Sequence, residues 1–131
     1  MNNNKNLIGK WSIDIMYGPG AQEDTFVVFL EDGTGWIEYI SSVFVEYDTF
    51  NWNISNNGEL NIVGIDNYDC DEGYSKSTIK FTNLKYEIKV EQTPSDIEME
   101  VLTFSEPLRC YECKFGIEKR DVNDIKTPKL D

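Results

Sequence analysis

Apolar and polar residues alternate along most of this chain, and this period of two limits the fold more than any other feature of the sequence. Residues 50–55 show the pattern, because Phe50, Trp52 and Ile54 alternate there with asparagine and serine. Turn-forming pairs such as Asp32-Gly33 separate the alternating segments, and no long segment has helical spacing. The sequence therefore predicts an all-β protein of roughly eight to ten strands.

The regular spacing of these strands also predicts their connections. Short turns favour sequential antiparallel neighbours, so we expect an up-and-down meander. Closing such a meander into an antiparallel up-and-down β-barrel removes its two exposed edges, and a two-sheet sandwich is the alternative. We expect a flexible N-terminus over residues 1–6, a single barrel domain over residues 7–120 and a loose C-terminal tail over residues 121–131.

The first apolar segment, residues 10–17, has the pattern of a strand. Its inward row would begin at Trp11 and continue through Ile13 and Ile15 to Tyr17. The glycines and proline that follow at residues 18–20 end the segment.

Three later segments carry their own expectations. Residues 36–47 read as one strand with a bulge at Ser41-Ser42, and residues 110–118 read as the last strand. At Thr82-Asn83 the parity of the apolar positions breaks, which indicates either a tight hairpin or a bulge in one long strand.

The chain is strongly acidic, and its charge is unevenly distributed. Lys and Arg number 12 and Asp and Glu number 24, which gives a formal net charge of −12. No basic residue lies between Trp11 and Ser75, a stretch that holds 13 carboxylates. A field of one sign repels nucleic acid and anionic membranes and attracts basic partners. The alternative interpretation is that the acidity serves solubility.

The composition also bears on location. Three cysteines, an odd number, fit a reducing compartment better than a disulfide framework. The chain has no long apolar run that would span a membrane, and its polar first residues do not resemble a signal peptide. We therefore expect a cytoplasmic protein without a membrane partner, and the oligomeric state stays open.

The segment Gly9-Lys10-Trp11 resembles the Gly-x-Trp signature on the first strand of lipocalins and related calycins. In that superfamily the tryptophan plugs the closed end of the barrel, and a basic residue near the end of the last strand packs over it. Arg120 is the matching residue here. The resemblance therefore implies barrel closure by Gly9, Trp11 and Arg120.

The order of later segments is similar to that of small bacterial lipocalin-like domains. The segments "FLEDGTG", "FNWNIS" and "ELNIVG" stand where those domains have their turn, their tryptophan-centred strand and the strand after it. The chain departs from fatty-acid-binding proteins, since residues 18–24 are too short for their two helices. It also lacks the long helix that follows the last strand of secreted lipocalins.

Few residues are suited to catalysis or metal binding. The chain has no histidine, which removes the commonest general base and metal ligand and excludes Ser–His and Cys–His nucleophile pairs. Cys110 and Cys113 have the spacing of a metal knuckle, but residues three apart on a strand point to opposite faces. We therefore predict no enzyme activity, no metal site and no cofactor.

Residues 66–76 form the longest polar connection and are rich in carboxylates. Such a loop could be a solvated surface, a contact for a basic partner or an oxygen-rich metal site, although its register does not match an EF-hand. We expect partner contact, if it occurs, at Asp66, Asp69, Asp71 and Glu72.

Aromatic residues recur on the predicted inward faces. They could fill the barrel as a packed core or line an open apolar calyx. In the second case the ligand-binding residues would be Trp11, Tyr17, Phe29, Phe50, Trp52, Tyr86, Tyr111 and Phe115.

Two functions follow from these observations. The first is a non-enzymatic lipocalin-like protein that takes a small apolar or aromatic ligand into the barrel. The alternative is an acidic inhibitor that binds a basic protein partner, as a toxin-immunity protein does. Neither function involves nucleic acid.

Overall fold

The computed structural model describes residues 5–18, 22–125 and 128. Short helices occur only near the start of this part of the chain, and strands make up most of the rest. The elements are η1 (Lys5–Leu7), β1 (Gly9–Ser12), α1 (Asp14–Tyr17), β2 (Glu23–Phe29), β3 (Thr34–Ser41), β4 (Val45–Ile54), β5 (Leu60–Asp69), β6 (Gly73–Lys76), β7 (Lys80–Leu84), β8 (Tyr86–Gln92), β9 (Glu98–Phe104) and β10 (Lys114–Lys119).

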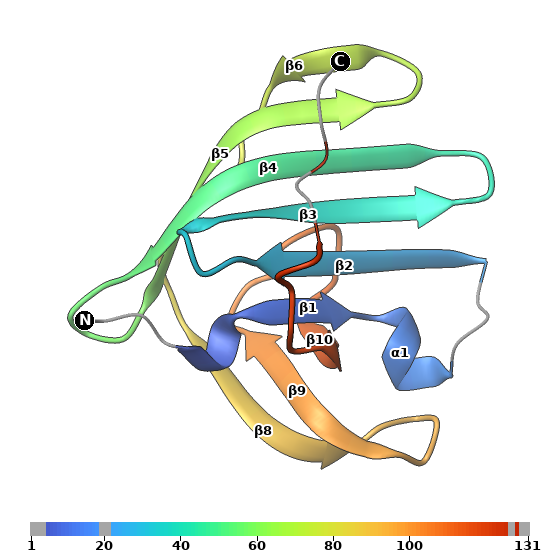
Figure 1. The fold of residues 1–131 in the computed structure, drawn as a ribbon, viewed down its shortest axis with the longest axis vertical. Helices are drawn as coiled ribbons and strands as arrows, with labels where there is room; N and C mark the ends of the chain where they lie inside the picture. Colours follow the sequence, from blue (N-terminus) through green and yellow to red (C-terminus); the bar gives the residue numbers. More distant parts are fainter. Residues whose placement is uncertain (1–4, 19–21, 126–127, 129–131) are drawn as a thin grey trace.

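All described strands belong to one antiparallel sheet, which curls around its own core (Figure 1). Hydrogen-bonded neighbours follow the order β6-β5-β4-β3-β2-β1-β10-β9-β8, and β7 pairs with β5 beside β6. The all-β antiparallel prediction is confirmed. The sheet does not close into the barrel that we expected, because the path of paired strands ends at β6 and β7 on one side and at β8 on the other.

The path of paired strands is interrupted near Thr82-Asn83, where the alternation of apolar positions changes parity. β7 pairs with β5, whereas β8, which begins after Lys85 alone, pairs with β9. The register shifts opposite Asn61, whose side chain accepts a hydrogen bond from the Asn83 backbone nitrogen at 2.9 Å. The chain therefore contains a bulge rather than a hairpin at this point. Residues 80–92 pair with β5 over their first part and with β9 over their second part, and do not join both strands along their whole length.

The first strand is shorter than its apolar alternation predicted. β1 ends at Ser12, and the chain turns into α1. Trp11 and Ile13 pack against the hydrophobic core as expected, but the continuation of the inward row through Ile15 to Tyr17 is wrong. The Asp24 carboxylate accepts hydrogen bonds from the Ser12 hydroxyl at 2.8 Å and from the Asp14 backbone nitrogen at 3.0 Å. A side chain from β2 thus stabilises the turn that interrupts the strand.

Two other expected strands are also divided or shortened. Residues 36–47 contain a turn, because Ser41 donates its backbone N–H to the Phe44 carbonyl at 2.9 Å and β4 begins at Val45. Residues 110–113 precede β10 and form the end of a turn in which Arg109 bridges to Glu112. The predicted turn at Asp32-Gly33 is present, with Gly33 at φ +88°.

The inner face of the curled sheet is filled by one hydrophobic cluster. Its members come from most strands, and every one is at most 8% exposed. The cluster consists of Leu7, Trp11, Val27, Phe29, Ile37, Phe50, Trp52, Leu60, Ile62, Leu84, Leu102, Phe104, Leu108 and Phe115. Close packing of this kind leaves little room for a ligand.

A second cluster lies on the outer face of β2 to β4. Val28, Trp36, Tyr47 and Val122 form its buried part. We expected a loose tail from residue 121, yet Val122 is 5% exposed and packs on this face. The red segment that follows β10 runs in front of the sheet (Figure 1). Residues 1–4, 126–127 and 129–131, where we also expected looseness, lie outside the described residues.

The longest helix among the residues that the structure describes is α1, which is far too short to cross a membrane.

Candidate functional site

The aromatic residues predicted to line a ligand site are not brought together around an open cavity. Five of them, Trp11, Phe29, Phe50, Trp52 and Phe115, are at most 6% exposed and belong to the inner cluster. Tyr86 is half-buried against the same cluster. Packed core is therefore the interpretation that fits these six residues.

The other two predicted ligand residues lie at the surface. Tyr17 ends α1 and is 62% exposed, and Tyr111 is 94% exposed at the tip of a turn. Both line one shallow groove of about 430 Å³, whose apolar part includes Ile13, Met16 and Val101. The predicted set thus divides into a core and one small surface groove.

The contact predicted between Trp11 and Arg120 is present. The Arg120 guanidinium carbon lies 5.1 Å from the Trp11 ring centroid, within the range of a cation–π interaction. Trp11 is fully buried, and its indole N–H donates to the Leu7 carbonyl at 2.8 Å. Gly9 lies against the end of β10, since a Cβ there would lie 3.0 Å from the Lys119 carbonyl oxygen.

The carboxylates predicted for partner contact do not form one exposed patch. Asp66 and Asp69 are half-buried on β5, and only Asp71 and Glu72 are exposed, in the tight turn before β6. The Asp69 carboxylate accepts hydrogen bonds from the backbone nitrogens of both turn residues, at 2.9 and 2.6 Å. Its role is therefore to stabilise the turn. Within the described residues, no group of carboxylates and thiols is arranged to hold a metal ion.

A different acidic site lies on the outer face of β1, β2 and β3. It is a pocket of about 460 Å³, which we call the outer acidic pocket. Ile15, Phe26 and Ile40 supply its apolar surface, and Lys10 is the only basic residue among the described residues that line it. Its four carboxylates belong to Asp14, Asp24, Glu38 and Glu118.

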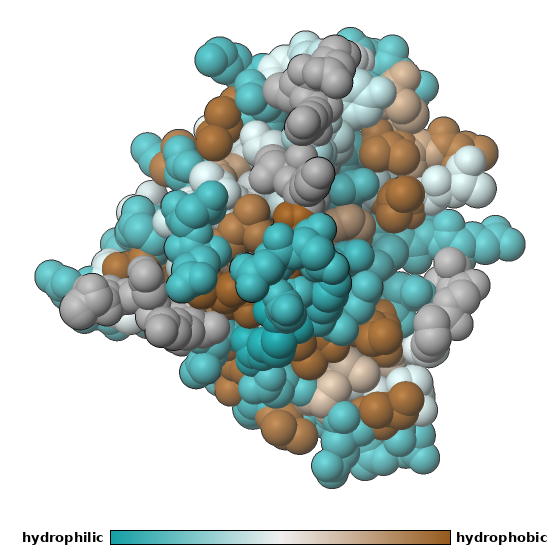
Figure 2. All heavy atoms as spheres, viewed as in Figure 1, coloured by the Kyte–Doolittle hydropathy of each residue, from teal (hydrophilic) through white to brown (hydrophobic). Residues whose placement is uncertain are grey.

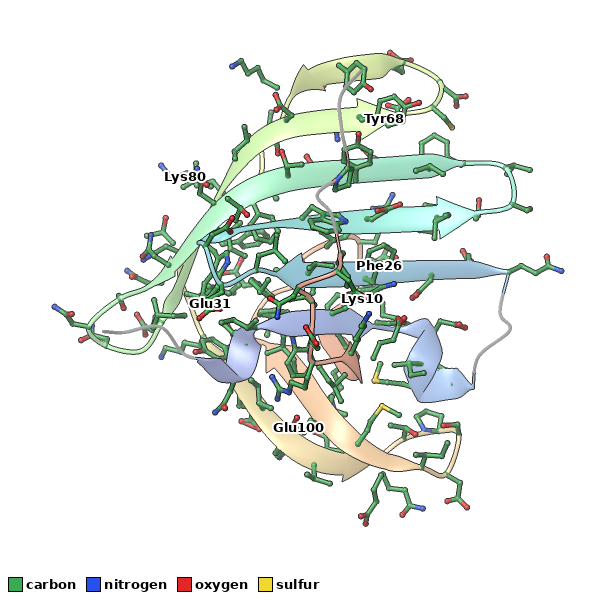
Figure 3. The ribbon with its side chains drawn as sticks, viewed as in Figure 1. Lys10, Phe26, Glu31, Tyr68, Lys80 and Glu100 are labelled. Carbon is green, nitrogen blue, oxygen red and sulfur yellow. The ribbon has the colours of Figure 1, made fainter. Side chains whose placement is uncertain are left out.

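Lys10 shows how a cation sits in this pocket (Figure 3). Its Nζ lies 4.3 Å from the centroid of the Phe26 ring and 3.3 Å from a carboxylate oxygen of Glu118. An aromatic face and a carboxylate are the two groups that recognise ammonium and guanidinium ions best. With one lysine among four carboxylates, the pocket retains an excess of negative charge.

Two of these carboxylates are held in poorly hydrated positions. Burial raises the pKa of Asp24 above its usual range, although the hydrogen bonds from Asp14 and Ser12 oppose the shift. Burial likewise raises the pKa of Glu38, which accepts a hydrogen bond from the Trp36 indole nitrogen at 3.2 Å. A cation that entered the pocket would stabilise both charged forms.

An aromatic row extends the pocket across the outer face. Phe26 lies opposite Glu38, which lies opposite Tyr47 on β4, then Tyr68 on β5 and Tyr74 on β6. The ring centroids of Tyr47 and Tyr68 are 5.3 Å apart, and those of Tyr68 and Tyr74 are 4.8 Å apart. Figure 2 shows this side of the molecule with hydrophobic residues interspersed among hydrophilic ones. The surface can therefore offer both apolar contact and negative charge to a partner.

Sequence reasoning did not identify this site, although a signal for it was present. Lys10, Ser12 and Asp14 are the polar half of the first alternating segment, and Asp24 and Phe26 share a parity in the second. The sequence does not show that β1 and β2 pair in the register that places Ser12 opposite Phe26. The pocket depends on that register and on the turn into α1.

Mild acidification is expected to stabilise the fold. The pKa values of Asp24, Glu38 and Glu112 are raised chiefly by burial, so the folded state binds these protons more tightly than the unfolded state. Their stabilising contribution is complete below the unfolded pKa of about 4 and is lost as the pH rises through the folded values. The melting temperature should therefore be a few degrees higher at about pH 5 than at pH 7.

A series of melting curves recorded by circular dichroism checks this expectation. The variant Asp24→Asn, which cannot ionise at that position, should show a smaller rise. A melting temperature that falls steadily from pH 7 to about pH 5 would contradict carboxylates whose pKa values are raised by burial.

Comparison with known proteins adds no assignment: no family model, no curated protein and no solved structure matches this chain.

Proposed function

We propose that this protein is a non-catalytic binding module that docks a basic protein partner on its outer face. The observation that carries the proposal is the outer acidic pocket, where four carboxylates surround one lysine beside an apolar surface. The net charge of −12 adds long-range attraction for such a partner. Inhibition of a basic toxin by an immunity protein is one activity of this class.

The test begins with a photo-crosslinking amino acid placed at Ile40, which is 40% exposed at the edge of the pocket. Crosslinked proteins are recovered from cells of the organism that encodes the chain, and the purified partner is then titrated calorimetrically. We expect a basic protein whose affinity falls at least tenfold between about 50 and about 200 mM salt. An acidic partner, or an affinity that does not depend on salt, would refute the proposal.

We also propose that the fold is lipocalin-like. The curled antiparallel meander and the contact of Arg120 with the buried Trp11 support this relationship. A lipocalin-like barrel requires continuous pairing across residues 80–92, so an open edge between β7 and β8 in a crystal structure would refute this relationship.

Binding of a small apolar or aromatic ligand is the second candidate function. The groove that contains Tyr17 and Tyr111 favours it, since Met16 and Val101 supply an apolar wall beside two exposed phenol rings. Displacement of a fluorescent dye by fatty acids, haem or retinoids tests this function separately. The filled inner cluster gives the same ligands no equivalent place inside the sheet.

A further inference from the structure

A second groove lies at the other end of β1 and β2 from the outer acidic pocket. The pocket contains Ser12 and Phe26, whereas this groove contains Ile8, just before β1, and Leu30, just after β2. We call it the basal groove. It encloses about 550 Å³, and its apolar surface consists of Ile8, Leu30, Val122 and Ile125.

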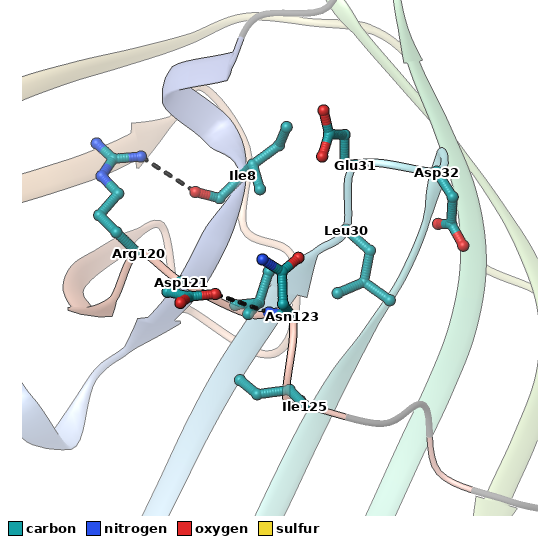
Figure 4. A pocket seen from close by; sticks show the side chains of 9 residues that line it. Ile8, Leu30, Glu31, Asp32, Arg120, Asp121, Asn123 and Ile125 are labelled. Atoms are coloured by element: carbon teal, nitrogen blue, oxygen red, sulfur yellow. Dashed lines mark hydrogen bonds between the residues drawn. The ribbon is translucent and has the colours of Figure 1, made fainter.

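Carboxylates also surround the basal groove. Glu31 and Asp32 extend from the turn between β2 and β3, and Asp121 begins the C-terminal segment (Figure 4). All three are exposed. Asp32 and Asp121 accept hydrogen bonds from the backbone nitrogens of Thr34 and Asn123 through Oδ1, each at 3.0 Å. Neither of these bonds uses Oδ2.

Among the described residues that line the groove, the one cation is engaged elsewhere. Arg120 donates to the carbonyls of Asn6 and Ile8 and forms an ion pair with Glu100 at 2.5 Å. Figure 4 shows Arg120 and Glu31 on opposite sides of Ile8. The positive charge of Arg120 is therefore largely balanced by Glu100. Asp121 lies within electrostatic reach of Lys119, whose Nζ pairs with Asp124, and among the described residues Glu31 and Asp32 form no ion pair.

We infer that the basal groove binds an arginine or lysine side chain of the basic partner, as a second anchor beside the outer acidic pocket. This inference rests on the proposed function. The aliphatic stem of such a side chain packs against Ile8 and Leu30, and its charged end reaches Glu31 and Asp121. Ile8 and Ser12 are four residues apart on an extended chain, so the two anchors are roughly 13 Å apart. An extended segment with two basic residues about four positions apart matches this spacing.

The test uses n-butylguanidinium as the probe and n-butylurea, a neutral molecule of nearly the same shape, as its control. Each is titrated into the 15N-labelled full chain, and amide chemical shifts are recorded by NMR. We expect n-butylguanidinium to shift the amides of Leu30, Asp32 and Asn123, with an affinity at least tenfold higher than that of n-butylurea. Equal binding of the two probes, or shifts elsewhere only, would overturn the inference.

Variants identify the groups responsible. Glu31→Gln and Asp121→Asn should each weaken n-butylguanidinium binding about three- to fivefold, in keeping with exposed charge pairs. Glu106→Gln removes one carboxylate from the exposed connection between β9 and β10 and should leave the affinity unchanged. Equal affinities for wild type, Glu31→Gln and Asp121→Asn would also overturn the inference.

Binding measurements with the partner distinguish a failure of this inference from a failure of the proposed function. A basic partner that binds in a salt-dependent manner but tolerates Glu31→Gln together with Asp121→Asn would refute the basal anchor and leave the proposed function standing. If no basic partner exists and n-butylguanidinium still binds in the groove, the proposed function fails and the chemistry of the groove is supported.

Discussion

Replacing Trp11 by alanine is expected to lower the free energy of unfolding by about 3–5 kcal/mol, the usual loss for a large aromatic ring in a packed core. Trp11 is 0% exposed and contacts the inner cluster, so the substitution leaves a cavity that its neighbours cannot fill. It also leaves the Leu7 carbonyl without the indole N–H that donates to it. Urea denaturation of both proteins gives the difference.

Two further variants separate the causes of this loss. Trp11→Phe keeps most of the buried ring but removes the hydrogen bond, so it should cost less than Trp11→Ala. Arg120→Gln removes the cation over the ring together with its bonds to the Asn6 and Ile8 carbonyls and to Glu100, and it should cost about 1 kcal/mol, because that side chain is at the surface. A loss below about 1 kcal/mol for Trp11→Ala would indicate a loose, ligand-sized interior instead of a packed one.

Substitution of Gly35 by alanine is expected to destabilise the fold by about 3 kcal/mol or more. Gly35 lies on β3 between Phe29 and Phe50 on the neighbouring strands. A Cβ at this position would lie 2.2 Å from the Val28 carbonyl oxygen and 2.7 Å from a ring carbon of Phe50. The oxygen belongs to the backbone of a paired strand, so relief of this overlap requires the sheet itself to shift.

Gly73→Ala is the matched control for this effect. Gly73 has φ +84°, yet a Cβ there would meet no atom within 4 Å. Its replacement should cost about 1–2 kcal/mol from backbone conformation alone. If Gly35→Ala lowers the free energy of unfolding no more than Gly73→Ala does, in thermal or urea unfolding, that result would contradict the close approach of β2, β3 and β4.

The class of fold was predictable because the apolar alternation of strands such as β4 is regular and local. Turn residues at Asp32-Gly33 placed one hairpin correctly, since their chemistry depends on few neighbours. Closure of the sheet was not predictable in the same way. Closure depends on whether residues 80–92 pair with one neighbouring strand or with two, and the register shift opposite Asn61 accompanies the change of partner.

The ends of elements were harder to predict because distant side chains determine them. Apolar alternation continues past Ser12 in the sequence, but Asp24 from β2 bonds the turn that starts α1. Nothing in residues 10–17 reveals that partner. Tyr17 therefore lies at the surface although its parity matched that of Trp11.

The candidate site followed the sequence only in its general character. The long base-free stretch predicted an acidic surface, but it did not indicate which of its carboxylates meet in one pocket. The outer acidic pocket instead gathers carboxylates from β2, β3, β10 and the start of α1. Residues so far apart in sequence meet only through the strand order, in which β10 lies next to β1.

The docking of a basic partner in the outer acidic pocket is tested most directly by charge changes of opposite sign. The double variant Glu38→Gln/Glu118→Gln removes two of the four carboxylates, and Lys10→Met removes the lysine that shares the pocket. The double variant Glu87→Gln/Glu106→Gln changes the net charge equally at exposed positions that do not line the outer acidic pocket.

The decisive measurement is the dissociation constant of the crosslinked partner for these three variants and the wild type, at about 50 mM salt. We predict binding at least tenfold weaker for Glu38→Gln/Glu118→Gln, severalfold tighter for Lys10→Met and nearly unchanged for Glu87→Gln/Glu106→Gln. Equal effects of the two double variants would show that only the overall charge matters, and that result would contradict a binding site in the outer acidic pocket.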